Sequence, residues 1–120
     1  AAFLRTHLHP GDSVQPLDWV NGAEHGMLLA RAPVATRFVH EYQFFHDVDD
    51  PLIQSLRREF IAGLNRVQPR FIIDVYEGRP YVSGPGTDNT FPELDALIAQ
   101  HYHHVSDGNG FVIDERNSTW

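Results

Sequence analysis

The chain has 120 residues and no cysteine, which indicates a single domain and excludes disulfides and thiol chemistry. Its nine cationic residues are all arginines, and its formal net charge is -7. This charge argues against nonspecific binding to nucleic acid or to an anionic membrane surface, because both need clustered positive charge. No apolar run reaches the roughly 18 residues that a membrane-spanning helix requires.

The amino-terminal part of the chain carries little local pattern. Ala1 to Asp12 is mixed in composition and includes Pro10 and Gly11, so we expect a lead-in segment rather than a helix or strand. Residues 13–120 are predicted to form the single domain. Ser13 to Val20 alternates in polarity and predicts a first strand, with Pro16 best tolerated near its start or on an unpaired side.

A short helix and an aromatic segment are expected next. Asn21 and Glu24 have the spacing of a capping box, and the helix should run to Arg31 or Ala32. Thr36 to Phe45 is rich in aromatic and β-branched residues, which predicts a second strand or a strand with an extended loop.

The clearest pattern lies in the middle of the chain. Asp50 can cap a helix that ends at Gln68, because the proline at position 69 disfavours a helical conformation for the residue before it. The apolar stripe predicted for this helix consists of Leu52, Ile53, Leu56, Phe60, Ile61, Leu64 and Val67. The apolar run from Phe71 to Tyr76 follows at once and predicts a strand that is covered on both faces.

The last third of the chain predicts a loop, a helix and a hairpin. Glu77 to Asn89 is rich in glycine and proline, which is typical of a loop. Thr90 and Glu93 form a second capping box, and the helix they begin should continue to about Tyr102. The final two strands, joined by a turn-rich tetrapeptide, are predicted at His103–Ser106 and Phe111–Glu115.

Strands that alternate with helices are typical of an α/β fold. The predicted order is β-α-β-α-β-α-β-β, and right-handed crossovers would place helices on both faces of the sheet. We therefore expect a small three-layer α/β/α domain with a largely parallel sheet and a C-terminal β-hairpin at one edge.

The eight histidines are the first candidates for chemistry. His101, His103 and His104 crowd together, and His40 and His46 share one segment, but neither group has the spacing of three or four converging zinc ligands. The acidic stretch from His46 to Asp50 has no calcium-loop pattern and is better explained as a solvated turn before the next helix. We expect no bound metal and no cofactor, since glycine-rich phosphate loops and nucleophile motifs are also missing from the sequence.

Two acids remain as candidates for a ligand site. Asp18 and Asp74 each lie near the carboxyl end of a predicted parallel strand, which is where open α/β sheets bind ligands. Trp19 beside Asp18 could stack on a sugar ring, and Asn21 could donate hydrogen bonds. These four residues are the predicted substrate-binding positions, and no catalytic residue is assigned. Isolated acids at strand ends are also common in folds that have no catalytic role.

Four stretches of the chain resemble a family of membrane enzymes. They are RAPVATRF at Arg31–Phe38, PRFIIDV at Pro69–Val75, FPEL at Phe91–Leu94 and GFVIDER at Gly110–Arg116. In their order they resemble the carboxyl-terminal soluble, periplasmic domain of bacterial multi-pass membrane glycosyltransferases similar to dolichyl-phosphate-mannose protein mannosyltransferases. The resemblance runs from about Asp12 to Arg116.

The resemblance implies a context for the domain rather than a chemistry. In that family the donor is a polyprenyl-phosphate sugar, and the catalytic carboxylates lie in the membrane half, at positions that this chain does not contain. The chain would then be a non-catalytic accessory domain on the extracytoplasmic face of a bacterial inner membrane. Ala1–Asp12 would follow the last membrane helix. Its partners would be the transmembrane half of the same chain and a glycan or lipid-linked sugar, with no nucleic acid. The alternative is a free-standing α/β domain with a ligand or enzymatic site at the strand ends.

Overall fold

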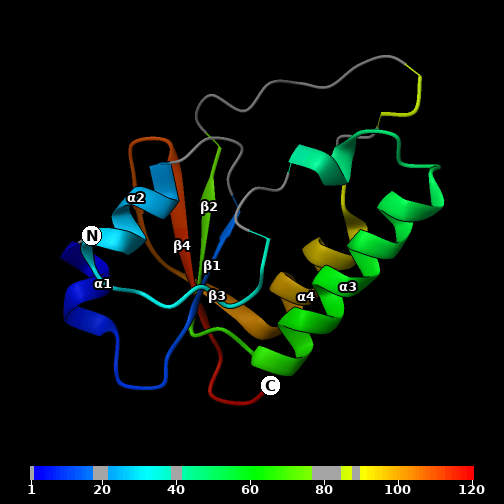
Figure 1. The fold of residues 1–120 in the computed structure, drawn as a ribbon. Coiled ribbons are helices and arrows are strands. Elements are labelled where there is room, and N and C mark those ends of the chain that lie inside the picture. Colours follow the sequence, from blue (N-terminus) through cyan, green and yellow to red (C-terminus); the bar gives the residue numbers. More distant parts are fainter. Residues whose placement is uncertain (1, 18–21, 39–41, 77–84, 88–89) are drawn as a thin grey trace.

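The computed structural model describes residues 2–17, 22–38, 42–76, 85–87 and 90–120. Figure 1 shows a sheet with helices on either side of it. The elements in chain order are α1 (Ala2–His7), β1 (Val14–Leu17), α2 (Gly22–Leu29), the 3-10 turn η1 (Tyr42–Phe45), α3 (Pro51–Val67), β2 (Phe71–Val75), α4 (Pro92–His101), β3 (Tyr102–Gly108) and β4 (Phe111–Arg116).

The described residues form a four-stranded sheet in the order β1-β2-β4-β3. β1 pairs with β2 in parallel, whereas β4 pairs antiparallel with both β2 and β3. The α/β class and the hairpin at one edge are thus confirmed, but the sheet is parallel only at its β1–β2 end. The reason is that α4 leads directly into β3, and β4 then turns back to lie between β3 and β2. A left-handed Gly110, with φ +83°, completes the tight hairpin turn.

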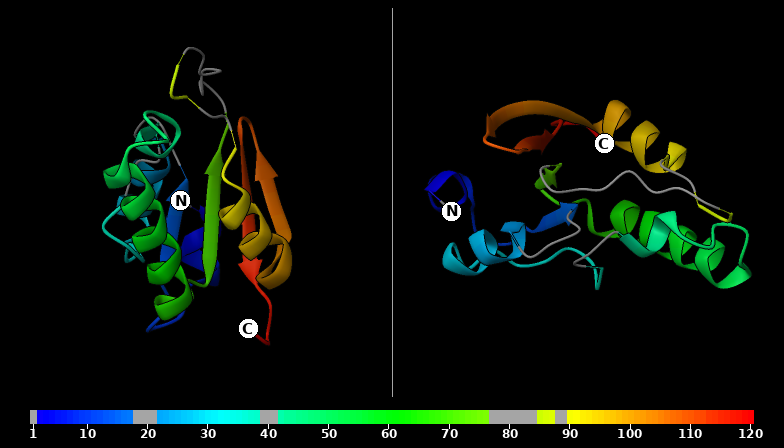
Figure 2. Two further views of the ribbon diagram at one scale, coloured as in Figure 1. Left: turned by 90° about the vertical axis from the view of Figure 1, so that its right-hand side faces the viewer. Right: turned by 90° about the horizontal axis from the view of Figure 1, so that it is seen from above.

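Helices cover both faces of the sheet, which confirms the three layers (Figure 2). α1 and α2 pack on one face around Phe71 and Ile73 of β2, while α3 and α4 pack on the other around Ile72. β2 is therefore an interior strand with both faces buried, as predicted. A strand covered on both faces should also make Val75 inaccessible, but Val75 at the end of β2 is only half-buried, so that expectation is wrong.

The ends of α3 are those that the sequence predicts. The Asp50 carboxylate accepts a hydrogen bond from the Leu52 amide at 2.8 Å, and Pro51 occupies the first turn. Gln68 closes the helix in a left-handed conformation with φ +52°. The predicted apolar stripe is too long, however. Leu52 and Val67 are exposed, because only the middle turns of α3 pack against the sheet.

The expectation that residues 1–12 contain no regular element is wrong, because residues 2–7 form α1. Leu4 is buried, and the ring of Phe3 packs edge-on against Phe71 with centroids 5.4 Å apart. A helix of six residues is too short to show a hydrophobic period in the sequence. Its burial against β2 supplies the stability that its length does not.

The aromatic segment Thr36–Phe45 contains no strand in its described parts. Its phenylalanines instead fill the core under α3: Phe44 stacks on Phe60 with ring centroids 5.1 Å apart, and Phe38 packs against both rings. Just before it, Val34 makes an isolated parallel bridge to Val14 at the outer edge of β1. The aromatic composition that resembled a strand reflects core packing.

The start of α4 also differs from the prediction. Pro92 occupies the first turn as expected, but the N-cap is Phe91, which makes no side-chain capping hydrogen bond. The predicted capping box of Thr90 and Glu93 is therefore wrong. The buried Phe91 ring joins the aromatic cluster of α3 and η1, so packing rather than capping fixes this helix start. Tyr102 begins β3 instead of ending the helix.

Candidate functional site

Three of the four predicted ligand-binding residues, Asp18, Trp19 and Asn21, lie outside the described residues. The fourth, Asp74, lies near the end of β2 opposite Leu17 of β1 and Val112 of β4. Because β1 and β2 are parallel neighbours, their carboxyl ends lie at the same end of the sheet, as the predicted site requires.

Asp74 lies near two further acids. Burial raises the pKa of the Asp95 carboxyl on α4 and that of the Asp114 carboxyl on β4, and the charge of Asp74 adds to both shifts. A ring nitrogen of His104 lies 3.8 Å from Asp114 and partly offsets the rise in its pKa. The carboxylates of Asp74, Asp95 and Asp114 therefore lie near one another, with Asp114 opposite Ile72 in the strand register, and this favours a neutral or cationic ligand over an anionic one.

The structure does not bring the crowded histidines into one site. His101 stacks on Trp120 with ring centroids 4.1 Å apart, while His103 binds the Asn117 side chain at 2.6 Å. His104 is the third member and lies near Asp107 and Asp114. Within the part of the chain that the structure describes, no three His, Cys, Asp or Glu side chains are placed to hold a metal ion.

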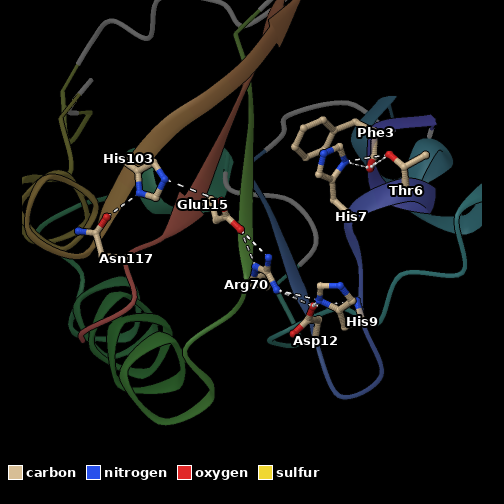
Figure 3. A network of polar contacts seen from close by, with 9 residues as sticks. All are labelled: Phe3, Thr6, His7, His9, Asp12, Arg70, His103, Glu115 and Asn117. Carbon is tan, nitrogen blue, oxygen red and sulfur yellow. Dashed lines mark hydrogen bonds and ion pairs between the residues drawn. The ribbon is translucent and has the colours of Figure 1, made fainter.

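A polar network lies at the opposite end of β2, and the sequence did not predict it (Figure 3). Arg70, directly before β2, donates from Nε to the Glu115 carboxylate at 2.7 Å. Its Nη1 lies 3.2 Å from Asp12 and 3.2 Å from the His9 ring. His103 lies on the far side of Glu115, with 3.8 Å between a ring nitrogen and the carboxylate. The network thus joins the loop after α1 to β2, β3 and β4.

Two shallow clefts of about 400 Å³ each flank this network. Arg70 and Arg116 line both of them, and Arg116 donates from Nη1 to the Gln68 carbonyl at 2.6 Å. The Asp12 and Glu115 carboxylates are both paired with the Arg70 guanidinium, at 3.2 Å and 2.7 Å. The arrangement is suited to structural bracing and to hydrogen bonding with a polar group. No spacing pattern in the sequence predicts this network, because its members lie far apart in the chain, between positions 9 and 117.

A third hollow of about 350 Å³ lies between α3 and the start of α4. Arg57 borders it, with its guanidinium 4.4 Å from the centroid of the Phe91 ring. The same group donates to the carbonyl of Phe44 at 2.8 Å and to that of Thr90 at 3.0 Å. Arg57 therefore holds η1 and the start of α4 on α3, which is a structural role.

Comparisons with known proteins show a likeness of fold. The chain matches no known family profile and no curated protein sequence. Its fold is similar to the crystal structure of the C-terminal globular domain of an oligosaccharyltransferase from Archaeoglobus fulgidus, with a TM-score of 0.51 and 14% sequence identity. The likeness covers 97% of this chain and 93% of that one. At this identity the likeness is one of fold alone. Among the described residues, no helix has the length and apolar character to span a bilayer.

Proposed function

We propose that the chain is a non-catalytic accessory domain of a membrane glycosyltransferase. The observation that carries the proposal is the fold likeness to a C-terminal domain of an oligosaccharyltransferase, which extends over nearly the whole of both chains. A likeness of that extent relates the two domains as wholes and is not confined to one shared motif. In this role the domain packs on the membrane half of its own chain and helps to recruit the acceptor.

The sequence resemblance supports the finer part of the proposal. It concerns a bacterial enzyme of the mannosyltransferase-like kind, with a polyprenyl-phosphate sugar as donor and this domain on the periplasmic face. The matching stretches Pro69–Val75 and Gly110–Arg116 include the two interior strands β2 and β4. Phe91–Leu94 starts α4, and Arg31–Phe38 leads from α2 along β1. These are positions that preserve a fold, which suits a domain whose chemistry is supplied elsewhere.

The test compares three proteins in one assay of sugar transfer from a polyprenyl-phosphate donor. They are the full chain encoded by the gene, the same chain without residues 13–120, and the 120-residue chain alone. We expect transfer by the full chain, a loss of acceptor use in the truncated chain and no transfer by the 120 residues. Transfer by the 120-residue chain that Asp74→Asn abolishes would contradict the proposal, as would a gene that encodes no membrane helices.

A second candidate function is ligand binding at the carboxyl ends of β1 and β2. The parallel pairing that sets Leu17 opposite Asp74 favours it, because Asp18 and Trp19 follow Leu17 in the chain. In this proposal Trp19 stacks on a sugar ring, while Asp18, Asn21 and Asp74 accept or donate hydrogen bonds. The negative charge near Asp74 favours a neutral glycan.

NMR titration tests the second candidate. The indole signal of Trp19 should shift saturably with a neutral glycan, and Asp74→Asn should weaken the binding. Trp120 is an internal control, since it stacks on His101 at the opposite end of the sheet. Equal shifts of both tryptophans, or none, would contradict a site at the strand ends.

A further inference from the structure

The tip of α2 presents two neighbouring leucines to solvent. Leu28 is 71% exposed and Leu29 is 52% exposed, although Met27 beside them is buried in the core. α2 needs only one apolar stripe to pack on the sheet, and Ala23 and Met27 supply it. The two leucines therefore lie largely outside that packing, and contiguous exposed apolar surface marks interaction sites.

Two arginines lie close to these leucines. Arg5 of α1 donates to the Leu29 carbonyl at 3.3 Å, and the exposed Arg31 lies in the turn that ends α2. α1 itself has no acidic residue in its first turn and has Arg5 and His7 in its last. We call Arg5, Leu28, Leu29 and Arg31 the α2-tip surface.

The α2-tip surface lies beside α1. α1 begins at Ala2, and Figures 1 and 2 show it next to the carboxyl end of α2 on the same side of the sheet. This inference rests on the accessory role proposed above, in which residues 1–12 follow the last membrane helix and α1 lies near the bilayer. The surface would then be held near the lipid headgroups without any binding energy of its own.

We propose that the α2-tip surface docks on the phospholipid bilayer. Leu28 and Leu29 enter the boundary between headgroups and acyl chains, and Arg5 and Arg31 bind lipid phosphates. Apolar side chains beside basic ones are the composition that such interfacial contacts use. The net charge of -7 opposes adsorption of the whole chain, but salt limits that repulsion to about 8 Å. Docking is therefore local and depends on the tether.

The experiment uses the absence of cysteine, which makes any introduced cysteine a unique labelling site. The 120-residue chain is tethered by an amino-terminal oligohistidine tag to phosphatidylcholine vesicles that contain a chelating lipid. An environment-sensitive fluorophore is placed at Leu29→Cys or, as a matched control, at Leu52→Cys on α3, where the leucine is 63% exposed. We expect the emission of the probe at position 29 to shift to the blue on tethering and that of the probe at position 52 to stay unchanged.

Two further variants separate the apolar and charged contributions. Leu28→Asp should abolish the shift at position 29. Replacing both Arg5 and Arg31 by Gln should lower the equilibrium constant for docking about fivefold per charge when the vesicles contain phosphatidylglycerol. Arg58→Gln, which removes an exposed charge from α3, should leave it unchanged.

The outcomes also separate this inference from the proposed function. A probe at position 29 that remains in water, or one at position 52 that shifts equally, overturns bilayer docking even if the gene encodes a membrane half. If position 29 were shielded from water only in the reconstituted full chain, the surface would dock on protein. That result would equally overturn bilayer docking. A blue shift at position 29 of the tethered chain, together with a gene that encodes no membrane helices, would uphold lipid docking and reject the accessory role.

Discussion

Arg70 and Glu115 form a hydrogen-bonded ion pair across neighbouring strands, with Arg70 Nε 2.7 Å from the carboxylate. Arg70 precedes β2, and Glu115 faces Phe71 in the register of β2 with β4. The same guanidinium reaches Asp12 at 3.2 Å (Figure 3). One side chain therefore fastens the loop that follows α1 to the interior of the sheet.

Replacing Arg70 by Met should destabilise the domain by about 1.5 to 3 kcal/mol, the range for hydrogen bonds to charged groups. The change leaves Asp12 and Glu115 in partly buried positions without their cation. Urea denaturation measures the loss. Arg37→Met is the matched control, because Arg37 pairs with Glu59 at the surface and exposed pairs contribute little. If both changes lowered the free energy of unfolding equally, the ion pairs of Arg70 would contribute no more than an exposed surface pair.

Coupling within the network can be measured separately. A double-mutant cycle of Arg70→Met with Asp12→Asn should give an interaction energy of about 0.5 to 3 kcal/mol, as for residues in direct contact. A cycle of Arg70→Met with Asp49→Asn, which changes an exposed acid in the turn before α3, should give a value near zero. Additive effects of Arg70→Met and Asp12→Asn would contradict a stabilising contact between Arg70 and the loop after α1.

Ile73→Ala should cost about 2 to 5 kcal/mol through lost transfer energy and a residual cavity. Ile73 is buried in the interior strand and packs with the residues of α1 and α2. The denaturant midpoint should fall accordingly, whereas Leu52→Ala, at an exposed position on α3, should change it little. An unchanged midpoint for Ile73→Ala would show that β2 is not the core of the sheet.

Gln15→Leu should destabilise the domain by about 1 to 3 kcal/mol despite its greater hydrophobicity. The buried Gln15 amide donates to the Phe38 carbonyl at 2.7 Å, and its oxygen accepts from the Thr36 hydroxyl at 2.7 Å. Leucine leaves the Phe38 carbonyl and the Thr36 hydroxyl without their hydrogen bonds to Gln15. Thr36→Val removes the second contact and the 3.3 Å hydrogen bond that the Phe38 amide donates to the Thr36 hydroxyl, but it keeps the bond from Gln15 to the Phe38 carbonyl and should cost less. A Gln15→Leu variant as stable as the parent would refute the role of this side chain.

Asp114→Asn should change how stability depends on pH. Burial raises the pKa of the folded Asp114 carboxyl above its usual 3.8. The stability that this group contributes is complete below the unfolded pKa and is lost as the pH rises through the folded pKa. The variant should therefore be the more stable protein at neutral pH and should match the parent below about pH 4.

Denaturation midpoints between pH 3 and pH 8 check this expectation. Asp95 has a raised pKa as well, so part of the decline with pH should remain in Asp114→Asn. The exposed Asp49→Asn is the control and should leave the profile unchanged. A variant less stable than the parent at neutral pH would show that the contact with His104 outweighs the cost of burial.

The sequence by itself determined the elements whose signals are local. Asp50 and Pro51 begin α3 because a side-chain cap and a fixed proline φ act within one turn. The apolar run of β2 is buried on both faces, and the glycine at position 110 permits the hairpin turn. Each of these features depends on residues within a few positions of one another.

Only the tertiary structure decided the remainder. α1 is stable because Leu4 is buried against the sheet, and Phe91 begins α4 because its ring enters an aromatic cluster built from η1 and α3. The place of β4 next to β2 and the convergence of Asp12, Arg70 and Glu115 likewise join segments far apart in the chain. In these places the free energy comes from burial and charge pairing between distant residues, which no local pattern records.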